Sequence, residues 1–340
     1  MSRRAGSTLA LGALAAVHLA ALAAGFLAPY DPTEQNRSLP YAPPARLRFV
    51  DAGGAFHLRP FVYPMAEQGP GSGVYGDDRR QAYPVHFLVP GAPYRFAGLL
   101  RGRVHLFGVD EPGRILLLGT DGFGRDQLSR LLHGAQISLF AGLTATTLAL
   151  GVGWLLGTLS GFYGGWVDAA LMRGSELFLA LPWLYLLFAV RAVLPLSIPP
   201  ERAFLLLVLV IGLVDWARPA RLVRGVVLSA RERNYVLAAR GFGASDVYLI
   251  RRHIAPQTFG LLLTQAALLV PQYILAEVTL SFLGLGVSEP VPSWGNMLAD
   301  LQHYHVLESC WWMWAPGLVL VPVFLAYYAL SEALDRAGPA

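Results

Sequence analysis

The run ISLFAGLTATTLALGVGWLLGTLSGF, at Ile137–Phe162, contains no charged side chain. One α-helix of roughly 20 mostly apolar residues crosses a hydrocarbon core about 30 Å thick, so this run is long enough to span a membrane. The sequence therefore predicts an all-α polytopic membrane protein with six transmembrane helices. The other five expected spans are Leu9–Leu27, Ser175–Leu194, Phe204–Trp216, Phe259–Leu283 and Trp311–Leu330.

Composition agrees with extensive burial in lipid. Of the 340 residues, 55% are hydrophobic and 14% are charged, whereas a soluble domain carries about 25% charged residues. A large part of the chain therefore does not face water.

The chain has no lysine, so arginine carries all of its side-chain positive charge apart from histidine. A P-loop needs a lysine to reach the phosphates of ATP, and the sequence cannot form one. Cys310 is the single cysteine, and no metalloprotease or serine-hydrolase motif occurs. We expect no enzymatic activity, metal or cofactor on this chain. If ATP drives transport, ATP and Mg²⁺ must bind to a partner.

The first apolar segment has two interpretations. Arg3 and Arg4 precede it, and Ala21-Leu22-Ala23 fits the small-residue pattern of a signal-peptidase site. Apolar residues continue through Phe26 and Leu27, beyond that site, which favours an uncleaved membrane helix within residues 1–28.

Residues 29–118 differ in composition, being rich in proline, glycine, tyrosine and arginine. Arg46–Val50 and Phe56–Val62 flank Asp51-Ala52-Gly53-Gly54, a pattern typical of a β-hairpin. We therefore expect a small β-rich insertion outside the membrane, between the first two spans, with a loose loop at Ala66–Arg80. Further short strands are expected at His86–Val89, Tyr94–Phe96, Val104–Phe107 and Arg114–Leu118, with turns at Pro90-Gly91 and Glu111-Pro112-Gly113.

Residues 119–340 hold the other five expected spans, and the segment between the fourth and fifth, about 218–258, is rich in arginine. Glu232 and Asp246 are its only acidic residues. Short positive loops stay in the cytoplasm, so this segment and, counting through six spans, both termini are expected there. The arginines are Arg218, Arg221, Arg224, Arg231, Arg233, Arg240, Arg251 and Arg252.

Small residues are concentrated in this segment at Asn234–Asp246, where Gly243 permits a sharp turn between two short helices. From these residues alone, two interpretations stay open. The segment can be a docking surface for a partner, or a charged loop that fixes topology and does nothing more.

The segment resembles the cytoplasmic EAA loop of ATP-binding-cassette (ABC) importer permeases, in which Glu-Ala-Ala is followed by Gly and a distant Pro. Leu237 replaces the Glu of that pattern, and His253 and Ala255 occupy its Ile and Leu positions. Ala238, Ala239, Gly243 and Pro256 are in register with it. Other stretches resemble the second permease of dipeptide/oligopeptide-type importers, namely Leu27–Pro32, Leu118–Asp126, Gly161–Asp168, Ala276–Gly286 and Pro292–Leu298.

This resemblance implies a type I ABC importer permease fold in a bacterial inner membrane. It also implies a second permease subunit, two ATPase subunits and an extracytoplasmic solute-binding protein as partners. Gly164–Arg173 is expected to be a second ATPase contact. The residues expected to dock the ATPase are Tyr235, Ala238, Ala239, Gly243, Ser245, Asp246 and Pro256.

Glu277 is the ionisable residue that the sequence singles out within a span. Such residues are costly in lipid and usually face a cavity or a partner. Glu277 is therefore a candidate on the substrate path, or a hydrogen-bonded structural residue. A carrier driven by an ion gradient is the alternative function, but such carriers often contain inverted repeats, and no clear repeat is visible.

Overall fold

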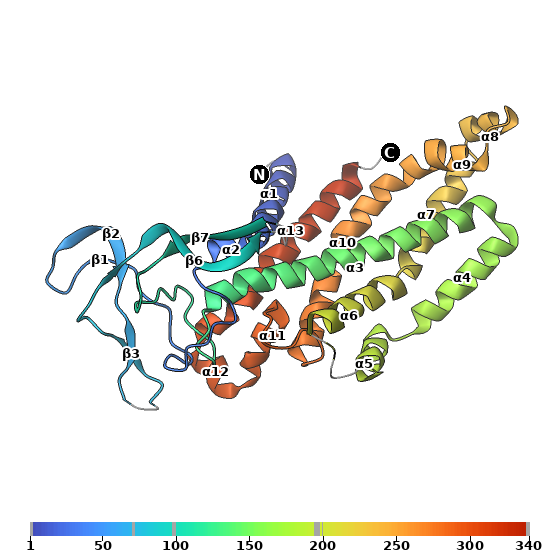
Figure 1. Cartoon of the computed structure of the whole chain (residues 1–340). Helices are drawn as coiled ribbons and strands as arrows, with labels where there is room; N and C mark the ends of the chain where they lie inside the picture. Colours follow the sequence, from blue (N-terminus) through green and yellow to red (C-terminus); the bar gives the residue numbers. More distant parts are fainter. Residues whose placement is uncertain (1–2, 70–71, 97–99, 194–197, 199, 338–340) are drawn as a thin grey trace. The chain divides into compact units, whose positions relative to one another are not determined.

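A computed structural model describes residues 3–69, 72–96, 100–193, 198 and 200–337 (Figure 1). Its contacts divide the chain into two units, and each is described by itself. The first unit comprises Met1–Leu14, Leu139–Glu277 and Pro322–Ala340, and the second comprises Ala15–Ser138 and Val278–Val321.

Three helices in the described part of the chain are long and apolar enough to cross a membrane: Gln127–Tyr163, Asp246–Phe282 and Trp311–Arg336. The first is α3. The second joins α9 (Asp246–Leu249), a π-helical turn (Ile250–Ile254) and α10 (Ala255–Phe282), and the third joins a 3-10 turn (Trp311–Trp314) and α13 (Ala315–Ala337). The predicted spans Ile137–Phe162, Phe259–Leu283 and Trp311–Leu330 therefore coincide with membrane-length helices.

The predicted span Ser175–Leu194 is interrupted. Its residues belong to α4 (Gly165–Ala180) and α5 (Trp183–Val193), a pair bent by 83° that would be a fourth span if it is counted as one, and Leu194 lies outside the described residues. The break falls at Leu181 and Pro182, because proline has no N–H to donate and disfavours helical geometry in the residue before it.

The remaining predicted spans are shorter in the structure. The first corresponds to α1 (Arg3–Leu22), whose apolar part is Gly6–Leu22, followed by α2 (Ala24–Leu27). The fourth corresponds to α6 (Pro200–Val214), a helix of 15 residues. The number of six transmembrane helices therefore stays a prediction.

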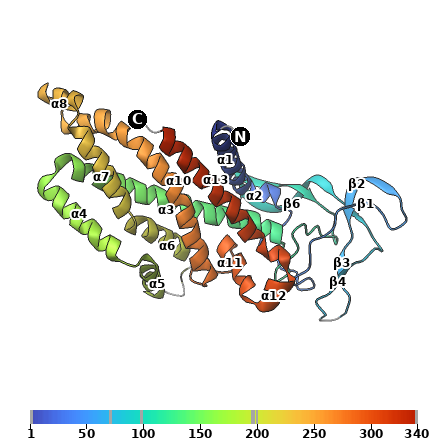
Figure 2. The same ribbon diagram turned by 180° about the vertical axis from the view of Figure 1, so that it is seen from behind.

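Short helices occupy the arginine-rich part of the first unit. They are α7 (Ala217–Arg231) and α8 (Asn234–Gly241), which precede α9. Figures 1 and 2 both show α7 beside α3, with α8 and α9 at its far end.

The β strands of the second unit form three small antiparallel sheets. Their core contains Val62, Tyr83, Val85 and Ile115. The first sheet is β1 (Arg48–Val50), β2 (Phe56–Val62) and β5 (Tyr83–Pro84), the second is β3 (Met65–Glu67) and β4 (Tyr75–Asp77), and the third is β6 (His86–Phe96) and β7 (Leu100–Gly108). The helical part of this unit includes α11 (Trp294–Ala299), a 3-10 turn (Asp300–Gln302) and α12 (Tyr304–Ser309).

The hairpin predicted around residues 51–54 is confirmed, since β1 pairs with β2 and Val50 lies opposite Phe56. The turn predicted at Pro90-Gly91 is wrong. His86–Val89 and Tyr94–Phe96 belong to the single strand β6, because β7 continues to pair with it and the extra residues form an irregularity between Pro90 and Tyr94.

Two other local predictions are also wrong. The expected loop at Ala66–Arg80 contains the paired strands β3 and β4, with Ala66 opposite Gly76. Arg114–Leu118 is not a strand, because its backbone groups bond elsewhere: Ile115 N–H donates to the Tyr30 hydroxyl (2.8 Å) and the Leu116 carbonyl accepts from Ala45 N–H (2.7 Å).

Candidate functional site

The segment from α8 to the start of α10, residues 234–256, contains all seven predicted docking residues and is named the coupling segment here. Gly243 lies between α8 and α9 with φ of +82°, a left-handed conformation that favours glycine. Ser245 caps α9, where its side chain accepts a hydrogen bond from Tyr248 N–H. The predicted sharp turn between two short helices is therefore confirmed.

The docking residues are mostly at the surface of the coupling segment. Tyr235, Ala238, Gly243, Ser245, Asp246 and Pro256 are exposed, while Ala239 is half-buried against the core beneath. Large apolar side chains lie exposed among them. Phe242 is 92% exposed and Leu237, at the position of the family's Glu, is 45% exposed. Their role in docking a partner stays a prediction.

The inner side of the coupling segment is a packed core. Val236, Leu249 and Ile254 are fully buried and form one cluster with Phe162 of α3 and the α7 residues Val223, Val227 and Ala230. Each fully buried aliphatic side chain stabilises the packed state by about 1.5–3 kcal/mol relative to exposure. The coupling segment therefore packs as one body with α7 and the end of α3.

Arginines predicted to fix topology also hold this body together. Arg224 of α7 donates through two nitrogens to Asp168 of α4, with Nη2–Oδ2 at 2.5 Å. Arg231 Nη1 donates to the Gly161 carbonyl at 2.9 Å, near the end of α3, where the helix dipole favours a cation. The Arg240 guanidinium lies 5.3 Å from the centre of the Phe162 ring. The predicted second contact, Gly164–Arg173, is not a loop but the beginning of helix α4, and it is tied to α7 through Asp168. Its contact with an ATPase stays a prediction.

A row of glycines joins α3 to α7 and was missed in the sequence. A Cβ atom at Gly157 would lie 2.3 Å from the Ala220 carbonyl oxygen, and one at Gly153 would lie 2.7 Å from Pro219 Cβ. Gly161 has equally little space, 2.8 Å from Val227 Cβ. The three glycines, named the glycine seam here, recur every fourth residue, a spacing that lets membrane helices approach closely and that is visible in the sequence.

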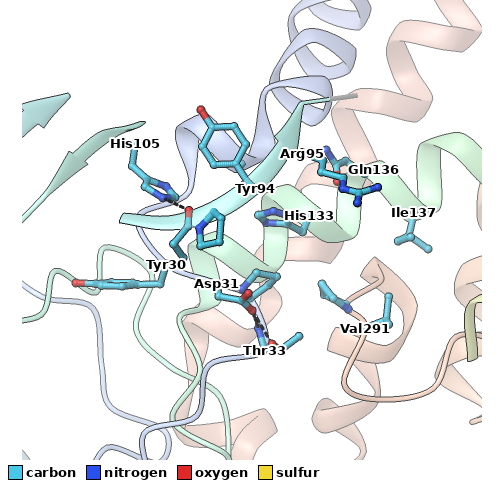
Figure 3. Close-up of a pocket in the computed structure, with 15 residues that line it drawn as sticks. Tyr30, Asp31, Thr33, Tyr94, Arg95, His105, His133, Gln136, Ile137 and Val291 are labelled. Atoms are coloured by element: carbon cyan, nitrogen blue, oxygen red, sulfur yellow. Dashed lines mark hydrogen bonds between the residues drawn. The ribbon is translucent and has the colours of Figure 1, made fainter. Parts of the chain in front are cut away.

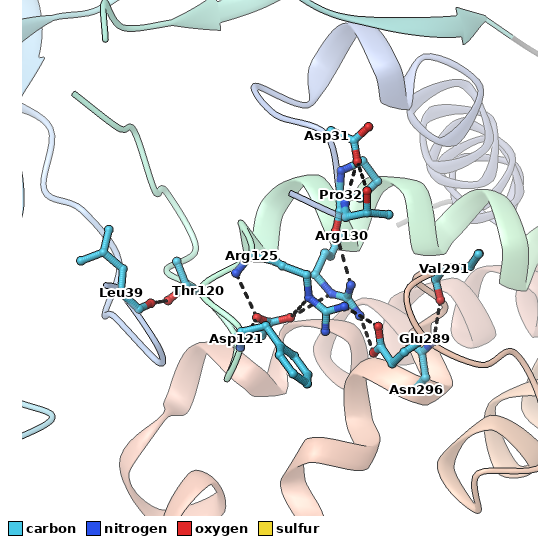
Figure 4. A network of polar contacts seen from close by, with 12 residues as sticks. Asp31, Pro32, Leu39, Thr120, Asp121, Arg125, Arg130, Glu289, Val291 and Asn296 are labelled. Carbon is cyan, nitrogen blue, oxygen red and sulfur yellow. Dashed lines mark hydrogen bonds and ion pairs between the residues drawn. The ribbon is translucent and has the colours of Figure 1, made fainter. Parts of the chain in front are cut away.

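The second unit contains a group of four charges, Asp121, Arg125, Arg130 and Glu289, named the ion cluster here (Figure 4). The first three are buried, and the Glu289 side chain is 43% exposed. Asp121 Oδ2 accepts from Arg125 Nε at 2.6 Å and lies 3.3 Å from Arg130 Nε. Glu289 Oε1 accepts from Arg130 Nη2 at 2.9 Å, and its other oxygen accepts from Arg125. Both arginine side chains are 2% exposed. Two positive charges are thus balanced by two carboxylates.

Two members of the ion cluster, Asp121 and Arg125, are positioned by a turn between residues that are close in the sequence. Asp121 Oδ1 accepts from the backbone N–H groups of Phe123 (2.9 Å) and Arg125 (3.0 Å), which closes a tight turn. Gly124 completes the turn with φ of +72°, where a Cβ would lie 1.8 Å from the Asn36 carbonyl oxygen. Burial lowers the pKa of the Arg125 guanidinium, whereas the carboxylates of Glu289 and Asp121 raise it. The effect of the carboxylates is larger, so the pKa is raised.

Two carboxyl groups beside the ion cluster are poorly solvated. Asp126 Oδ2 caps α3 by accepting from Ser129 N–H at 2.7 Å and from Ser129 Oγ at 2.6 Å. Burial nevertheless raises the pKa of Asp126 to about 6. Burial and the nearby Asp121 raise the pKa of Asp300 to about 6. The buried members of the ion cluster, Asp121, Arg125 and Arg130, therefore lie where water has little access and an unbalanced charge is costly.

Glu277 lies in α10 and is 2% exposed, so the structure places it inside the first unit. Its role on the substrate path stays a prediction. Within the described residues, no group of three or more His, Cys, Asp or Glu side chains is arranged to hold a metal ion.

Three helices long and apolar enough to cross a membrane, within the described residues, are those of a multi-pass membrane protein. The sequence profile of the family described as "Binding-protein-dependent transport system inner membrane component" matches residues 153–337, more than half of the chain. The chain belongs to this family. The predicted class of permease is thereby confirmed over an ion-gradient-driven carrier, and the protein is an inner-membrane transport component.

Proteins named as peptide permeases are similar to this chain. The chain is 38% identical over 222 residues to the di/tripeptide transport system permease protein DppC of Pseudomonas aeruginosa strain UCBPP-PA14, covering 65% of this chain and 71% of that protein. It is 36% identical over 220 residues to the dipeptide transport system permease protein DppC of Bacillus subtilis strain 168, covering 64% and 67%. A chain of the MetNI methionine ABC transporter, in an inward-facing crystal form, aligns at 17% identity and a TM-score of 0.41, over 62% of this chain and 96% of that one. That likeness is too distant to carry an argument.

Proposed function

We propose that this chain is the permease subunit of an ATP-driven importer of short peptides and forms half of its translocation pathway. The peptide and dipeptide permeases among its relatives support this substrate class. Its partners would be a second permease subunit, two ATPase subunits that hold ATP and Mg²⁺, and an extracytoplasmic solute-binding protein.

The coupling segment carries this proposal, because it combines an exposed apolar surface with a buried core. The ATPase would pack on Ala238, Gly243 and the neighbouring exposed side chains. Because the core beneath contains Phe162 of α3, and the glycine seam fixes α7 against α3, displacement of the coupling segment would move a membrane-spanning helix. ATP can drive this movement only if the ATPase binds the two states of the permease with different free energies.

The proposed topology has six spans and both termini in the cytoplasm. Residues 1–28 would form the first span with its cytoplasmic tip, residues 29–118 an extracytoplasmic insertion, and residues 119–340 the permease core. Glu277 would be a polar point along the pathway, within the last part of α10.

The coupling segment is tested by Gly243→Trp in the complete transporter, reconstituted in vesicles with its partners. A Cβ at Gly243 meets nothing within 4 Å, so the indole would project outward into the ATPase contact. We expect ATP hydrolysis to continue while peptide uptake per ATP falls by about 5- to 150-fold, the range of coupling free energies of about 1–3 kcal/mol.

Gly243→Ala is the matched control, because it imposes the same strain at positive φ without the bulk. We expect this variant to retain most of the uptake. Normal uptake by Gly243→Trp would contradict docking at the coupling segment, and uptake driven by an ion gradient without the ATPase would contradict the proposed function.

A further inference from the structure

A cavity of about 330 Å³ lies in the second unit beneath strand β6 (Figure 3). Arg95 from β6 and Gln136 from α3 line it with side chains that can donate hydrogen bonds. His133 lines it as well, but its Nδ1 donates to the Ser129 carbonyl oxygen at 2.9 Å, so a neutral ring has only an acceptor nitrogen left. Asp31 also lines it, but its Oδ1 already accepts from Thr33 N–H (2.8 Å) and Thr33 Oγ1 (2.5 Å). Tyr94, Ile137 and Val291 contribute apolar surface.

Two of its lining residues are at the ends of expected membrane spans. Gly25 lies just before the end of the first expected span, and Ile137 begins the apolar run of α3. The cavity therefore lies where the two spans meet the β-rich block. Lipid phosphates occupy this level of a bilayer, between the hydrocarbon core and water.

Three arginines on the β6–β7 hairpin lack a balancing charge. Arg95 lies directly opposite Arg101 in the ladder, and Arg103, two residues further along β7, shares the face of Arg101. All three are exposed, and the described residues provide none of them with an ion-pair partner. Like charges directly opposite each other destabilise a sheet. An anion bound from outside would remove this repulsion.

The hairpin is fastened so that Arg95 stays at the cavity, with Arg101 across the ladder from it. His105 of β7 has Nδ1 2.6 Å from the Ala28 carbonyl oxygen, at the end of α2, and Nε2 2.9 Å from the Ala92 carbonyl oxygen of β6. The Tyr94 ring packs onto Gly25 of α2, where a Cβ would lie 2.4 Å from Tyr94 Cδ2.

Apolar side chains lie next to the arginines. Phe96 pairs with Leu100 across the ladder, and they are 40% and 69% exposed. A cation beside exposed aromatic and aliphatic groups suits a ligand that is anionic at one end and apolar at the other. A free peptide carboxylate would need only the cation.

We propose that Arg95, Arg101 and Arg103, with Gln136 in the cavity, bind the phosphodiester group of an acidic phospholipid, whose acyl chains lie against Phe96, Leu100 and Ile137. Guanidinium groups donate in a fork that matches phosphate oxygens. The bound lipid would hold the β6–β7 hairpin on the membrane surface beside the first span.

The test uses the purified full chain in nanodiscs of phosphatidylcholine with increasing phosphatidylglycerol, and counts retained phosphatidylglycerol by native mass spectrometry. Since each arginine near a membrane surface contributes about a fivefold gain in affinity for acidic lipid, Arg95→Gln should weaken retention about fivefold. The triple variant Arg95→Gln, Arg101→Gln, Arg103→Gln should weaken it about a hundredfold.

Arg59→Gln is the matched control, because Arg59 is an exposed arginine on strand β2 of the same unit. It should retain phosphatidylglycerol like the unchanged chain. Equal retention by the triple variant, equal retention of phosphatidylcholine, or displacement of the lipid by a dipeptide at similar concentration would each overturn the proposal. The outcome is independent of ATPase docking at the coupling segment.

Discussion

The ion cluster and the α4–α7 contact next to the coupling segment both pair arginine with carboxylate, but they do so in different environments. In the ion cluster, Arg125 and Arg130 are 2% exposed and Asp121 is 1% exposed. In the contact between α7 and α4, Arg224 is 32% exposed and its partner Asp168 is 20% exposed. Removing one member of a buried ion pair leaves the other charge without a partner and without water, which is costly. At the surface, water solvates the remaining charge, so the cost is small.

We therefore expect the ion cluster to resist rearrangement and the ion pairs next to the coupling segment to rearrange more easily. The ion cluster has a net charge of zero only while all four groups stay together. The pairs around the coupling segment can loosen at small cost, which suits a region that is proposed to follow an ATPase through its cycle.

Among the variants that test this comparison, Asp121→Ala should reduce the free energy of unfolding most. This change leaves two buried arginines with the half-exposed Glu289, and we expect a loss of about 3–5 kcal/mol in the free energy of unfolding. Unfolding in mixed detergent micelles, followed by tryptophan fluorescence, measures it. Glu289→Gln should cost less, because that side chain is 43% exposed. Unchanged stability of Asp121→Ala would show that the ion cluster is not structural.

Gly157→Leu tests whether the coupling segment is joined firmly to the membrane helices. The leucine would push α7 away from α3, and overpacking of this kind costs about 1–3 kcal/mol. We expect lower stability together with reduced uptake per ATP in the reconstituted transporter. Gly151→Leu is the control on the same helix, where a Cβ meets nothing within 4 Å. If both variants behave alike, the glycine seam does not transmit the movement.

Arg224→Gln should have the smallest effect and sharpens the comparison with the ion cluster. Because this pair is partly exposed, we expect a loss of at most about 1 kcal/mol, decreasing further in high salt. The same micelle unfolding assay measures it, with the exposed Arg173→Gln of α4 as reference. A loss as large as that of Asp121→Ala would remove the distinction between the two regions.

Sequence reasoning worked where neighbours along the chain decide the structure. Gly243 and Ser245 predicted the turn within the coupling segment, since backbone freedom and helix capping are local properties. Strand prediction failed at Arg114–Leu118 and at Ala66–Arg80, because a strand exists only if another segment pairs with it. The glycine seam had a visible spacing at Gly153, Gly157 and Gly161, but only the facing Ala220 of α7 gives that spacing a meaning.

Long uncharged runs such as Ile137–Phe162 determined by themselves that this protein belongs in a membrane, because no fold in water could hide so much apolar surface in so few helices. The absence of lysine likewise determined that no P-loop can be formed. Only the tertiary structure brought Glu289 to Arg125, across 164 residues of chain, and placed Arg95 opposite Arg101 in the ladder, with no ion-pair partner among the described residues. Charges act through space rather than along the sequence, so their partners are decided only when the chain has folded.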